Sequence, residues 1–496
     1  MTARPPLLTR RPDWARPDGA EADDTSFALM TLSPLRADQS SELLQALLQR
    51  LGEVPPRLSA LIVGRAEGNP YYMEELVRRL IDDGVIDATG PKWTVQADRL
   101  ETLRLPTTLV GLLQARLDAL PAAERQAARQ ASVIGHVFWD DALQALDPQA
   151  PQALPALQRA AFVKARNSSD FEGTPERQFD HHLLHQVTYD TLLKAERRLG
   201  HGAAARWLQA RTQGRGAEFL AMTGEHAERA GETALAIDCF EQAGSQAQGR
   251  FANAAAIAWT RRALGLLGVS EPLRRFELLN RLGKIADTVG DRSHQDALLD
   301  EMAALLQRHP DDARQAEWLF SRAMLAERRG DTAGAEHLAK QAVSLAEHCG
   351  AARWAAMAHC QLGWTHITRY DYAGARQHLQ QGLTWAGRIE DAVTRAETEA
   401  QLLSVSAIVL VDLCQLDEAD RTLRAVLLRG ESLGKPRLQL GALSELPLVA
   451  SLRGRWDESR AWAERMHVLA SAIGSPRDIG LAQLRLAEAA EAQGDA

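Results

Sequence analysis

Residues 362–382, LGWTHITRYDYAGARQHLQQG, contain the pattern that decides the fold of this chain. Tyr370 stands between two amphipathic segments. The small residue Ala375 follows it after five positions, and Gly382 follows after seven more. Small residues on a helix face let a neighbouring helix approach closely, and a helix pair of this kind buries its apolar face against the next pair. The stretch therefore predicts two antiparallel helices joined by a tight turn.

The same pattern recurs along the C-terminal part of the chain. A turn residue followed by two small or apolar residues at the same distances occurs at Gly231, Ala236 and Ala243, at Gly330, Ala335 and Ala342, and at Gly454, Ser459 and Met466. The markers Ala335, Ala375, Ala419 and Ser459 are separated by 40, 44 and 40 residues. Glycine supplies the left-handed turn between the helices. We therefore expect a solenoid of helix pairs.

These residues resemble the tetratricopeptide (TPR) family. The best match is Leu362-Gly363, followed by Tyr370-Asp371-Tyr372 and Ala375. The spacing near 40 residues departs from the usual TPR period of about 34. The resemblance therefore implies helices longer than those of a regular TPR superhelix, of the kind found in bacterial signal-transduction ATPases.

Composition agrees with a helical, multi-part protein. A chain of 496 residues predicts two to four domains or a repeat array, and an aromatic content of only 5% favours helix. The net charge of -8 argues against a nucleic-acid surface over the whole protein. The four cysteines have no metal-ligand spacing, and we expect them to be small buried hydrophobes in a reducing cytoplasm: Cys239, Cys349, Cys360 and Cys414.

The first 200 residues have a different pattern. Helical periodicity and breakers predict helices at 37–51, 57–65, 71–83, 108–120, 122–134, 141–146 and 154–161. Short strands are expected at 7–9 and 27–32, and hairpins at 85–86 with 93–95 and at 162–165 with 177–179. Three helices followed by the second hairpin give the order of a winged helix.

Four ordered motifs in this region resemble the large bacterial STAND/AAA-type ATPases: GNPYYMEEL at 68–76, LLQARLDALP at 112–121, ASVIG at 131–135 and FDHHL at 179–183. Relatives carry an adenylate or guanylate cyclase domain in front or a LuxR-type DNA-binding domain behind. The resemblance implies a mainly α chain, with a truncated AAA/STAND lid and winged helix followed by a TPR-like α-solenoid. The implied parts are an ATPase-core remnant at 1–34, a helical lid with a small hairpin at 35–105, a winged-helix-like domain at 106–212 and repeats at 213–496.

The phosphate-binding elements of such ATPases are missing from the sequence. A P-loop needs GxxxxGK[ST]. Gly283-Lys284 and Gly434-Lys435 lack the upstream glycine, and no hydrophobic strand ends in Asp-Asp or Asp-Glu. By the resemblance, both elements would lie upstream of Met1. We therefore expect no enzyme and no cofactor, with ATP bound only if a partner chain supplies a P-loop.

Two segments are candidate remnants of a nucleotide site. Arg10 and Arg11 resemble the sensor segment, where an arginine faces the γ-phosphate. Gly68, Asn69 and Pro70 resemble the lid motif whose proline sits against adenine. The alternatives are solvated charges near a terminus for the arginines and a turn between helices for the second segment.

Other clusters favour structural interpretations. His181 and His185 share a helix face, but no glutamate follows in a HExxH arrangement, so we expect no metal site. Arg197, Arg198 and His201 form a basic segment, but the family uses its winged helix for coupling, and we do not expect nucleic acid as a partner. Carboxylates such as Glu74-Glu75 and Asp82-Asp83 are expected on solvated helix faces.

The sequence thus predicts a non-catalytic regulatory module for signal transduction that binds a protein partner or small effector through its repeats. A P-loop-bearing partner chain is a second expected partner. The alternative is the C-terminal part of an ATP-binding regulatory ATPase or cyclase, whose P-loop is on another chain or lost by truncation. The first residues contain no apolar stretch long enough for a secretory signal, and the longest apolar stretch, 402–411, is too short for a bilayer, so we expect a cytoplasmic protein without membrane contact.

Overall fold

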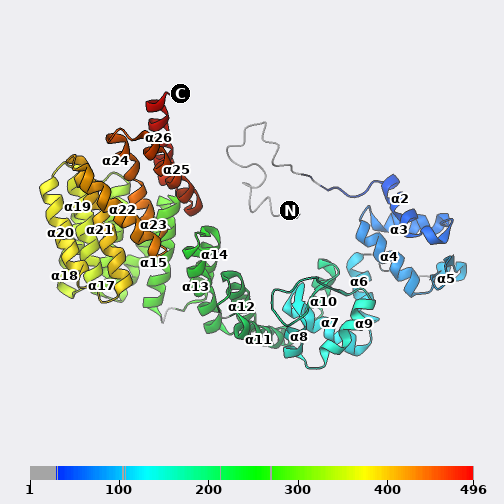
Figure 1. Ribbon diagram of the computed structural model, residues 1–496. Coiled ribbons are helices and arrows are strands. Elements are labelled where there is room, and N and C mark those ends of the chain that lie inside the picture. Colours follow the sequence, from blue (N-terminus) through cyan, green and yellow to red (C-terminus); the bar gives the residue numbers. More distant parts are fainter. Residues whose placement is uncertain are drawn as a thin grey trace. The chain divides into compact units, whose positions relative to one another are not determined.

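The computed structural model describes residues 30, 32–102, 106, 108–212, 214–268 and 271–494. The chain divides into two compact units, residues 1–196 and 197–496, which are shown in Figure 1. The strand predicted at 7–9, nearly all of the strand predicted at 27–32, and Arg10 and Arg11 lie outside the described residues.

The first unit begins with helices around a small apolar core that includes Leu48, Ile62 and Leu76. Its first elements are α2 (Ala37–Leu47), η2 (Gln49–Leu51), α3 (Pro56–Ala66), α4 (Pro70–Asp82), β1 (Ile86–Asp87), β2 (Thr94–Val95) and α5 (Ala97–Thr102). Strands β1 and β2 form an antiparallel hairpin. The three helices and the hairpin predicted here are confirmed, whereas α5 was missed.

The rest of this unit combines helices with a three-stranded antiparallel sheet of order β3-β5-β4. Its elements are α6 (Leu109–Asp118), α7 (Ala122–Ile134), β3 (Val137–Trp139), α8 (Asp140–Leu146), η3 (Ala150–Ala153), α9 (Leu154–Arg159), β4 (Val163–Ala165), β5 (Glu176–Phe179) and α10 (His182–Asp190). The predicted hairpin is confirmed as β4 and β5. The sequence pattern missed β3, because its three residues run directly into α8 without a turn signal.

Helix α11 (Lys194–Arg211) crosses the boundary, and the second unit is a succession of packed helices. These helices are α12 (Ala217–Ala230), α13 (Thr233–Gly249), α14 (Asn253–Leu266), α15 (Pro272–Val289), α16 (Arg292–Arg308), α17 (Asp312–Arg328), α18 (Thr332–Cys349), α19 (Ala352–Thr368), α20 (Tyr372–Ala386), α21 (Ala392–Asp412), α22 (Leu416–Ser432), α23 (Pro436–Leu443), α24 (Leu446–Leu452), α25 (Trp456–Ile473) and α26 (Pro476–Gln493). The protein is thus mainly α, with a TPR-like array of helix pairs and two small N-terminal sheets.

In this array, seven turns that lie between consecutive helices are built on a residue with a left-handed backbone. Four of these residues are glycines with φ between 72° and 81°, and three are other residues with φ between 56° and 62°. They are Gly231, Phe251, Gly290, Gly330, Tyr370, Cys414 and Gly454. At Gly330 and Tyr370 the next residue is an aspartate that caps the following helix, with its side chain accepting a backbone N–H. Turn and cap together end one helix and start the next.

The residues five positions after these turns are all buried, as the packing of small residues requires. The series is Ala236, Ala256, Gln295, Ala335, Ala375, Ala419 and Ser459. The structure confirms the predicted markers and their spacing. It adds repeats at Phe251, where the turn residue is not glycine, and at Gly290, where the buried residue is Gln295, and it places the turn before the predicted marker Ala419 at Cys414.

The cysteines only partly match the prediction. Cys239 and Cys360 are buried as expected, but Cys349 and Cys414 are exposed. Cys349 is the last residue of α18, and Cys414 occupies a left-handed turn between α21 and α22. The stretch 402–411 lies within α21, and Leu402 and Val409 are buried there. Among the helices that the structure describes, none is long and apolar enough to cross a membrane.

Replacing Gly382 by alanine tests the close packing of the repeats. A Cβ at this position would lie 2.6 Å from Leu402 Cδ2 and 3.2 Å from the Ala356 carbonyl oxygen. Overpacking costs about 1–3 kcal/mol. The matched control is Gly480→Ala in α26, where a Cβ meets nothing within 4 Å. The control gains about 1 kcal/mol of helix propensity.

We expect thermal unfolding to move in opposite directions, with a lower Tm for Gly382→Ala and an unchanged or higher Tm for Gly480→Ala. Equal Tm values for the two variants would contradict the close approach of α20 and α21.

Candidate functional site

The predicted lid motif forms the turn into α4. Gly68 has a φ of +75°, and its carbonyl accepts the Leu35 N–H at 2.8 Å. Asn69 caps the helix, since its Oδ1 accepts the Tyr72 N–H at 3.2 Å, and Pro70 is the first helical residue. Each of the three residues therefore has a backbone role in this turn. Their contact with a nucleotide remains a prediction, as does that of Arg10 and Arg11.

Glu75 is not on a solvated helix face, and that expectation was wrong. Its carboxylate is 2% exposed and pairs with the Arg116 guanidinium at 2.7 Å. Arg116 also donates to the carbonyls of Ala160 and Ala161 and lies over the Phe162 ring, 4.7 Å from its centroid. This arginine links α4, α6 and the start of β4. Glu74, in contrast, is exposed as expected.

The predicted histidine group also has structural contacts. The His181 ring stacks on Tyr71 with centroids 3.8 Å apart, and its Nδ1 accepts the Leu183 N–H, which caps α10. His185 Nε2 lies 2.9 Å from the Ser132 carbonyl oxygen. Within the described ranges, no three His, Cys, Asp or Glu side chains are grouped as a metal would require.

Polar side chains in the second unit link successive helices that precede the turns. We call α13, α15, α17, α19 and α21 the first-helix row. In this row, Arg274 on α15 pairs with Glu241 on α13 at 2.8 Å, and Arg314 on α17 pairs with Glu277 on α15 at 3.1 Å. The partners are separated by 33 and 37 residues, close to the repeat length. Periodic packing thus gives a ladder of ion pairs along the row.

A groove lies between the first two helices of the row. Its volume is about 560 Å³. Asp238, Glu241, Gln242 and Ser245 line it from α13, and Arg274, Glu277 and Arg281 line it from α15. The Arg281 guanidinium donates to the Glu241 carbonyl oxygen at 3.0 Å. Charged and amide side chains here surround a volume large enough for several residues of an extended chain.

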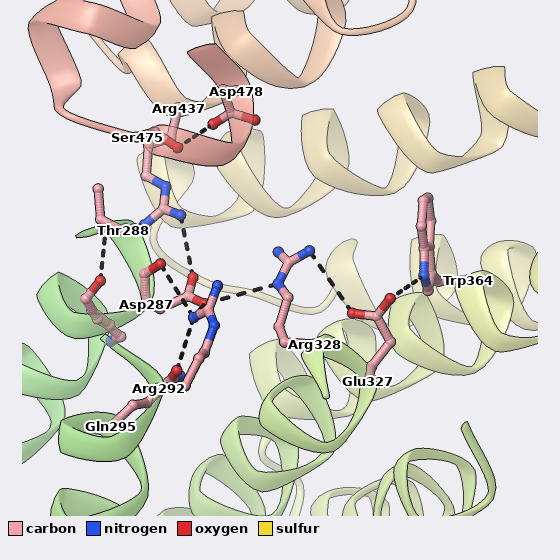
Figure 2. A network of polar contacts seen from close by, with 11 residues as sticks. Asp287, Thr288, Arg292, Gln295, Glu327, Arg328, Trp364, Arg437, Ser475 and Asp478 are labelled. Atoms are coloured by element: carbon pink, nitrogen blue, oxygen red, sulfur yellow. Dashed lines mark hydrogen bonds and ion pairs between the residues drawn. The ribbon is translucent and has the colours of Figure 1, made fainter. Parts of the chain in front are cut away.

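One cluster joins helices that are far apart in sequence (Figure 2). We call Asp287, Arg292, Arg328 and Arg437 the clasp. Asp287, at the end of α15, pairs with Arg292 at 2.7 Å, with Arg437 of α23 at 3.4 Å and with Arg328 of α17 at 3.9 Å. Arg437 also donates to Thr288 Oγ1 at 2.7 Å, as Figure 2 shows. The C-terminal repeats therefore return to α15.

A second contact supports this closure. Asn253 Nδ2, at the start of α14, donates to the Ile473 carbonyl oxygen at 3.0 Å, across 220 residues. Phe251 also packs partly against the apolar core of the C-terminal repeats. Residues 220 positions apart thus lie in contact, so the C-terminal helices pack against the start of the array.

The clasp places several cations around one carboxylate. The Asp287 side chain is only 10% exposed. Burial lowers the pKa of Arg328, and the nearby Arg477 lowers it further, whereas Asp287 raises it. Sequence reasoning missed this cluster, because no local spacing pairs residues 150 positions apart.

Comparison with known proteins gives a coarse picture. No family model matches the chain. An uncharacterized protein of Rhizobium meliloti (strain 1021) is 27% identical over 346 residues, which cover 63% of this chain and 30% of that relative. The chain thus matches less than a third of the length of this relative.

Solved structures with similar folds are helical-repeat proteins. A signal transduction ATPase with numerous domains (STAND) with a tetratricopeptide repeat sensor, from Pyrococcus horikoshii, is 11% identical with a TM-score of 0.35, covering 93% of this chain and 70% of the other. The apo quorum sensor NprR from B. thuringiensis is 14% identical with a TM-score of 0.39, covering 76% and 93%. A Rap protein complexed with Competence and Sporulation Factor is 10% identical with a TM-score of 0.34, covering 77% and 99%. The helix pairs and left-handed turns of the second unit, rather than these matches, identify the array as TPR-like.

Removing Arg116 tests the buried pair in the first unit. In Arg116→Met, the Glu75 carboxylate stays buried and keeps only the partly exposed Arg78 as an ion-pair partner, so we expect a loss of up to about 3–5 kcal/mol. Urea unfolding should show this loss in the transition of the first unit. The double variant Glu75→Gln/Arg116→Met should recover a large part of the loss, because it removes the buried charge. Equal loss in both variants would show that the arginine acts through its carbonyl contacts alone.

Loosening the clasp should change local opening more than stability. The variant Asn253→Ala/Arg437→Ala removes two contacts that are partly exposed, so we expect a loss of less than about 1 kcal/mol. Hydrogen exchange should become faster at the end of α25 and the start of α14. The control Arg376→Ala removes a contact between neighbouring repeats, 2.9 Å to Gln415, and should leave these amides unchanged. Unchanged exchange in the double variant would contradict the closure.

Proposed function

We propose that the chain is a non-catalytic regulatory module that binds a protein partner or small effector on the first-helix row of its repeats. The observation that carries this proposal is the groove between α13 and α15, where seven polar side chains surround about 560 Å³. Charged, hydrogen-bonding side chains on a rigid helical frame can recognise a ligand without large rearrangement.

The packing of the array favours binding over chemistry. Most polar groups of the row are held by neighbours of the adjacent repeat, such as Glu317, which receives Asn280 Nδ2 at 2.6 Å and Lys284 Nζ at 3.5 Å. Such pairing fixes side chains in place, which lowers the entropic cost of binding. The sequence lacks the Walker elements that an ATPase of the resembling family needs.

In this proposal the part of the chain before the repeats is the coupling part, with a lid at 35–105 and a winged-helix-like domain at 106–212. Its three-stranded sheet and preceding helices have the order expected for a winged helix. Arg116 supports the coupling role, because one side chain contacts both parts.

Partner binding is tested by selecting binders from a random-peptide library against the full chain. Hydrogen exchange of the chain with a selected peptide should show protection on α13, α15 and α17. The control is the same peptide in scrambled order. Selected peptides that protect only second helices, such as α18 and α22, would overturn the assignment of the row.

The absence of catalysis is tested with nucleotide. Titration of the purified chain with ATP and magnesium should show no binding at micromolar concentrations, and no phosphate should be released. Micromolar ATP binding by this chain alone would favour the alternative of an ATP-binding regulatory ATPase, and Pro70→Ala would then show whether the lid turn contributes.

A further inference from the structure

Three histidines meet where α19 packs against α20. His359 and His366 lie on α19, about two helical turns apart, and His378 lies on α20. His359 is buried, whereas His366 and His378 are partly exposed. The Nδ1 atoms of His359 and His378 are 3.1 Å apart, and the ring centroids of His366 and His378 are 5.1 Å apart. We call these three residues the histidine bridge.

A carboxylate holds each end of the histidine bridge. Glu347 Oε1 of α18 lies 3.2 Å from His359 Nε2, and Asp371 Oδ2, in the turn between α19 and α20, lies 2.7 Å from His366 Nδ1. Glu347 Oε1 also accepts the Trp385 indole N–H at 2.8 Å, and Asp371 caps α20. Because an ionised carboxylate only accepts hydrogen bonds, each one places a proton on the imidazole nitrogen that faces it.

These contacts assign the protons of the central pair. With its proton on Nε2, a neutral His359 has a lone pair on Nδ1, and the His378 Nδ1–H donates to it. One further proton can enter on His378 Nε2 without breaking this bond. A second would protonate His359 Nδ1 as well, so that two N–H groups and two positive charges would face each other across 3.1 Å. The folded pair therefore takes up one proton fewer than two separate imidazoles.

The surroundings of the histidine bridge also oppose protonation. Burial lowers the pKa of His378, the other two histidines and Lys340 of α18 lower it further, and Asp371 raises it. Lys340 is itself paired with Glu336 at 2.7 Å. The field at His378 thus favours its neutral form.

Helices α17 and α21 also pack against α19. Within the described residues, neither helix gives the histidine bridge a hydrogen bond or an ion pair. Glu327 of α17 accepts the Trp364 indole N–H at 2.9 Å, and Asp412 of α21 lies near Tyr372. The carboxylates at the two ends of the bridge are therefore the acidic groups in contact with it.

Close packing beside the histidine bridge couples its charge to the helices. Gly363 lies between His359 and His366 on α19, and Leu379 follows His378 on α20. A Cβ at Gly363 would lie 2.8 Å from Leu379 Cγ, so the two helices are in direct contact here. Repulsion between two charged rings at this position therefore acts on the packing of α20 and favours local opening of the helix pair.

We propose that the histidine bridge is an acid-sensitive latch, which keeps α20 on α18 and α19 while the central pair has at most one extra proton and releases α20 when a second proton enters. The inference goes beyond the proposed function and holds whatever the repeats bind. Because α19 belongs to the first-helix row, acid would loosen one repeat of that row.

The direction of the pH effect follows from counting protons. In an opened repeat, imidazoles take up protons below about pH 6.5. The open state then binds more protons than the closed state. Closure is therefore most stable above this pH and is weakened as the pH falls through it.

The test measures hydrogen exchange of the full chain by mass spectrometry at pH 7.5 and pH 5.5, with protection corrected for the chemical exchange rate at each pH. EDTA in all samples excludes a metal ion between the two Nδ1 atoms. The variant is His378→Gln, whose amide can hydrogen-bond to His359 but takes up no proton. The control is His337→Gln, which removes an exposed histidine of α18 outside the bridge. Circular dichroism at pH 7.5 checks that both variants are folded.

In wild type and in the control, we expect the protection of α20 amides to fall by up to about tenfold per pH unit below pH 6.5, because the open and closed states differ by one proton. Protection of α15, which contains no histidine, should fall by less. In His378→Gln the fall at α20 should be no larger than at α15. An equal fall in wild type and the variant, or a wild-type fall at α20 no larger than at α15, would overturn the inference.

A second measurement needs only the wild-type chain and so does not depend on the folding of a variant. An NMR titration of the imidazole Cε1–H signals follows each histidine from pH 7.5 to pH 5. We expect His359 and His378 together to take up one proton while the repeat stays closed. Two rings that both titrate near pH 6.5 in the closed repeat would show that the pair shares no proton and would rule out the latch.

Discussion

The left-handed turn followed by a buried small residue is the constraint on which the second unit depends. The turn stops one helix, and the small side chain five positions later lets the next helix pack closely against it. At Ala335 and Ala375 no side-chain surface remains exposed, so a larger residue has no room there. The turns at Gly290, Gly330 and Tyr370 are 40 residues apart, and each helix from α15 to α19 has 17 or 18 residues. Successive helix pairs therefore have nearly equal length and stack level with one another. Local geometry at one residue thus sets the length and stacking of the whole array.

The constant register explains the polar pattern on the first-helix row. If each helix is stacked on the next with the same offset, a side chain meets the residue about 33 to 37 positions later, as Glu277 meets Arg314 and Glu327 meets the Trp364 indole at 2.9 Å. Each exposed pair contributes little alone, about 0–1 kcal/mol. The main effect of these ion pairs is to hold the charged side chains in a line along the first-helix row. Small rotations between repeats then add up until α23 reaches α15, where Asp287 and Arg437 meet. The clasp is a result of the repeat geometry and has no local signal of its own.

The sequence predicts those parts that depend on neighbours along the chain. Helix ends at Gly330 and the hairpin β4–β5 follow from turn residues and alternation, and both are confirmed. The repeats at Phe251 and Gly290 were missed, because the Phe251 side chain gives no signal of its positive φ and because the buried residue after Gly290 is Gln295 rather than a small one. The pair of Glu75 and Arg116 was missed because burial of a charge depends on a partner 41 positions away. For the same reason neither the groove nor the clasp could be predicted from the sequence.

In a periodic array, the charges that break the period are more informative than those that follow it. A cation matched by its register neighbour is explained by packing alone. Thirty-seven positions after Arg281 stands Trp318, whose indole donates to the Leu299 carbonyl at 2.8 Å, and thirty-seven positions before Arg353 stands Ala316, which is fully buried. Glu317 stands between these two positions, and its carboxylate pairs with Lys284 at 3.5 Å. Burial lowers the pKa of Arg281, and Glu241 and Glu277 lie close enough to raise it. Packing between repeats therefore accounts for the charges of this row, through direct ion pairs and through attraction at longer range.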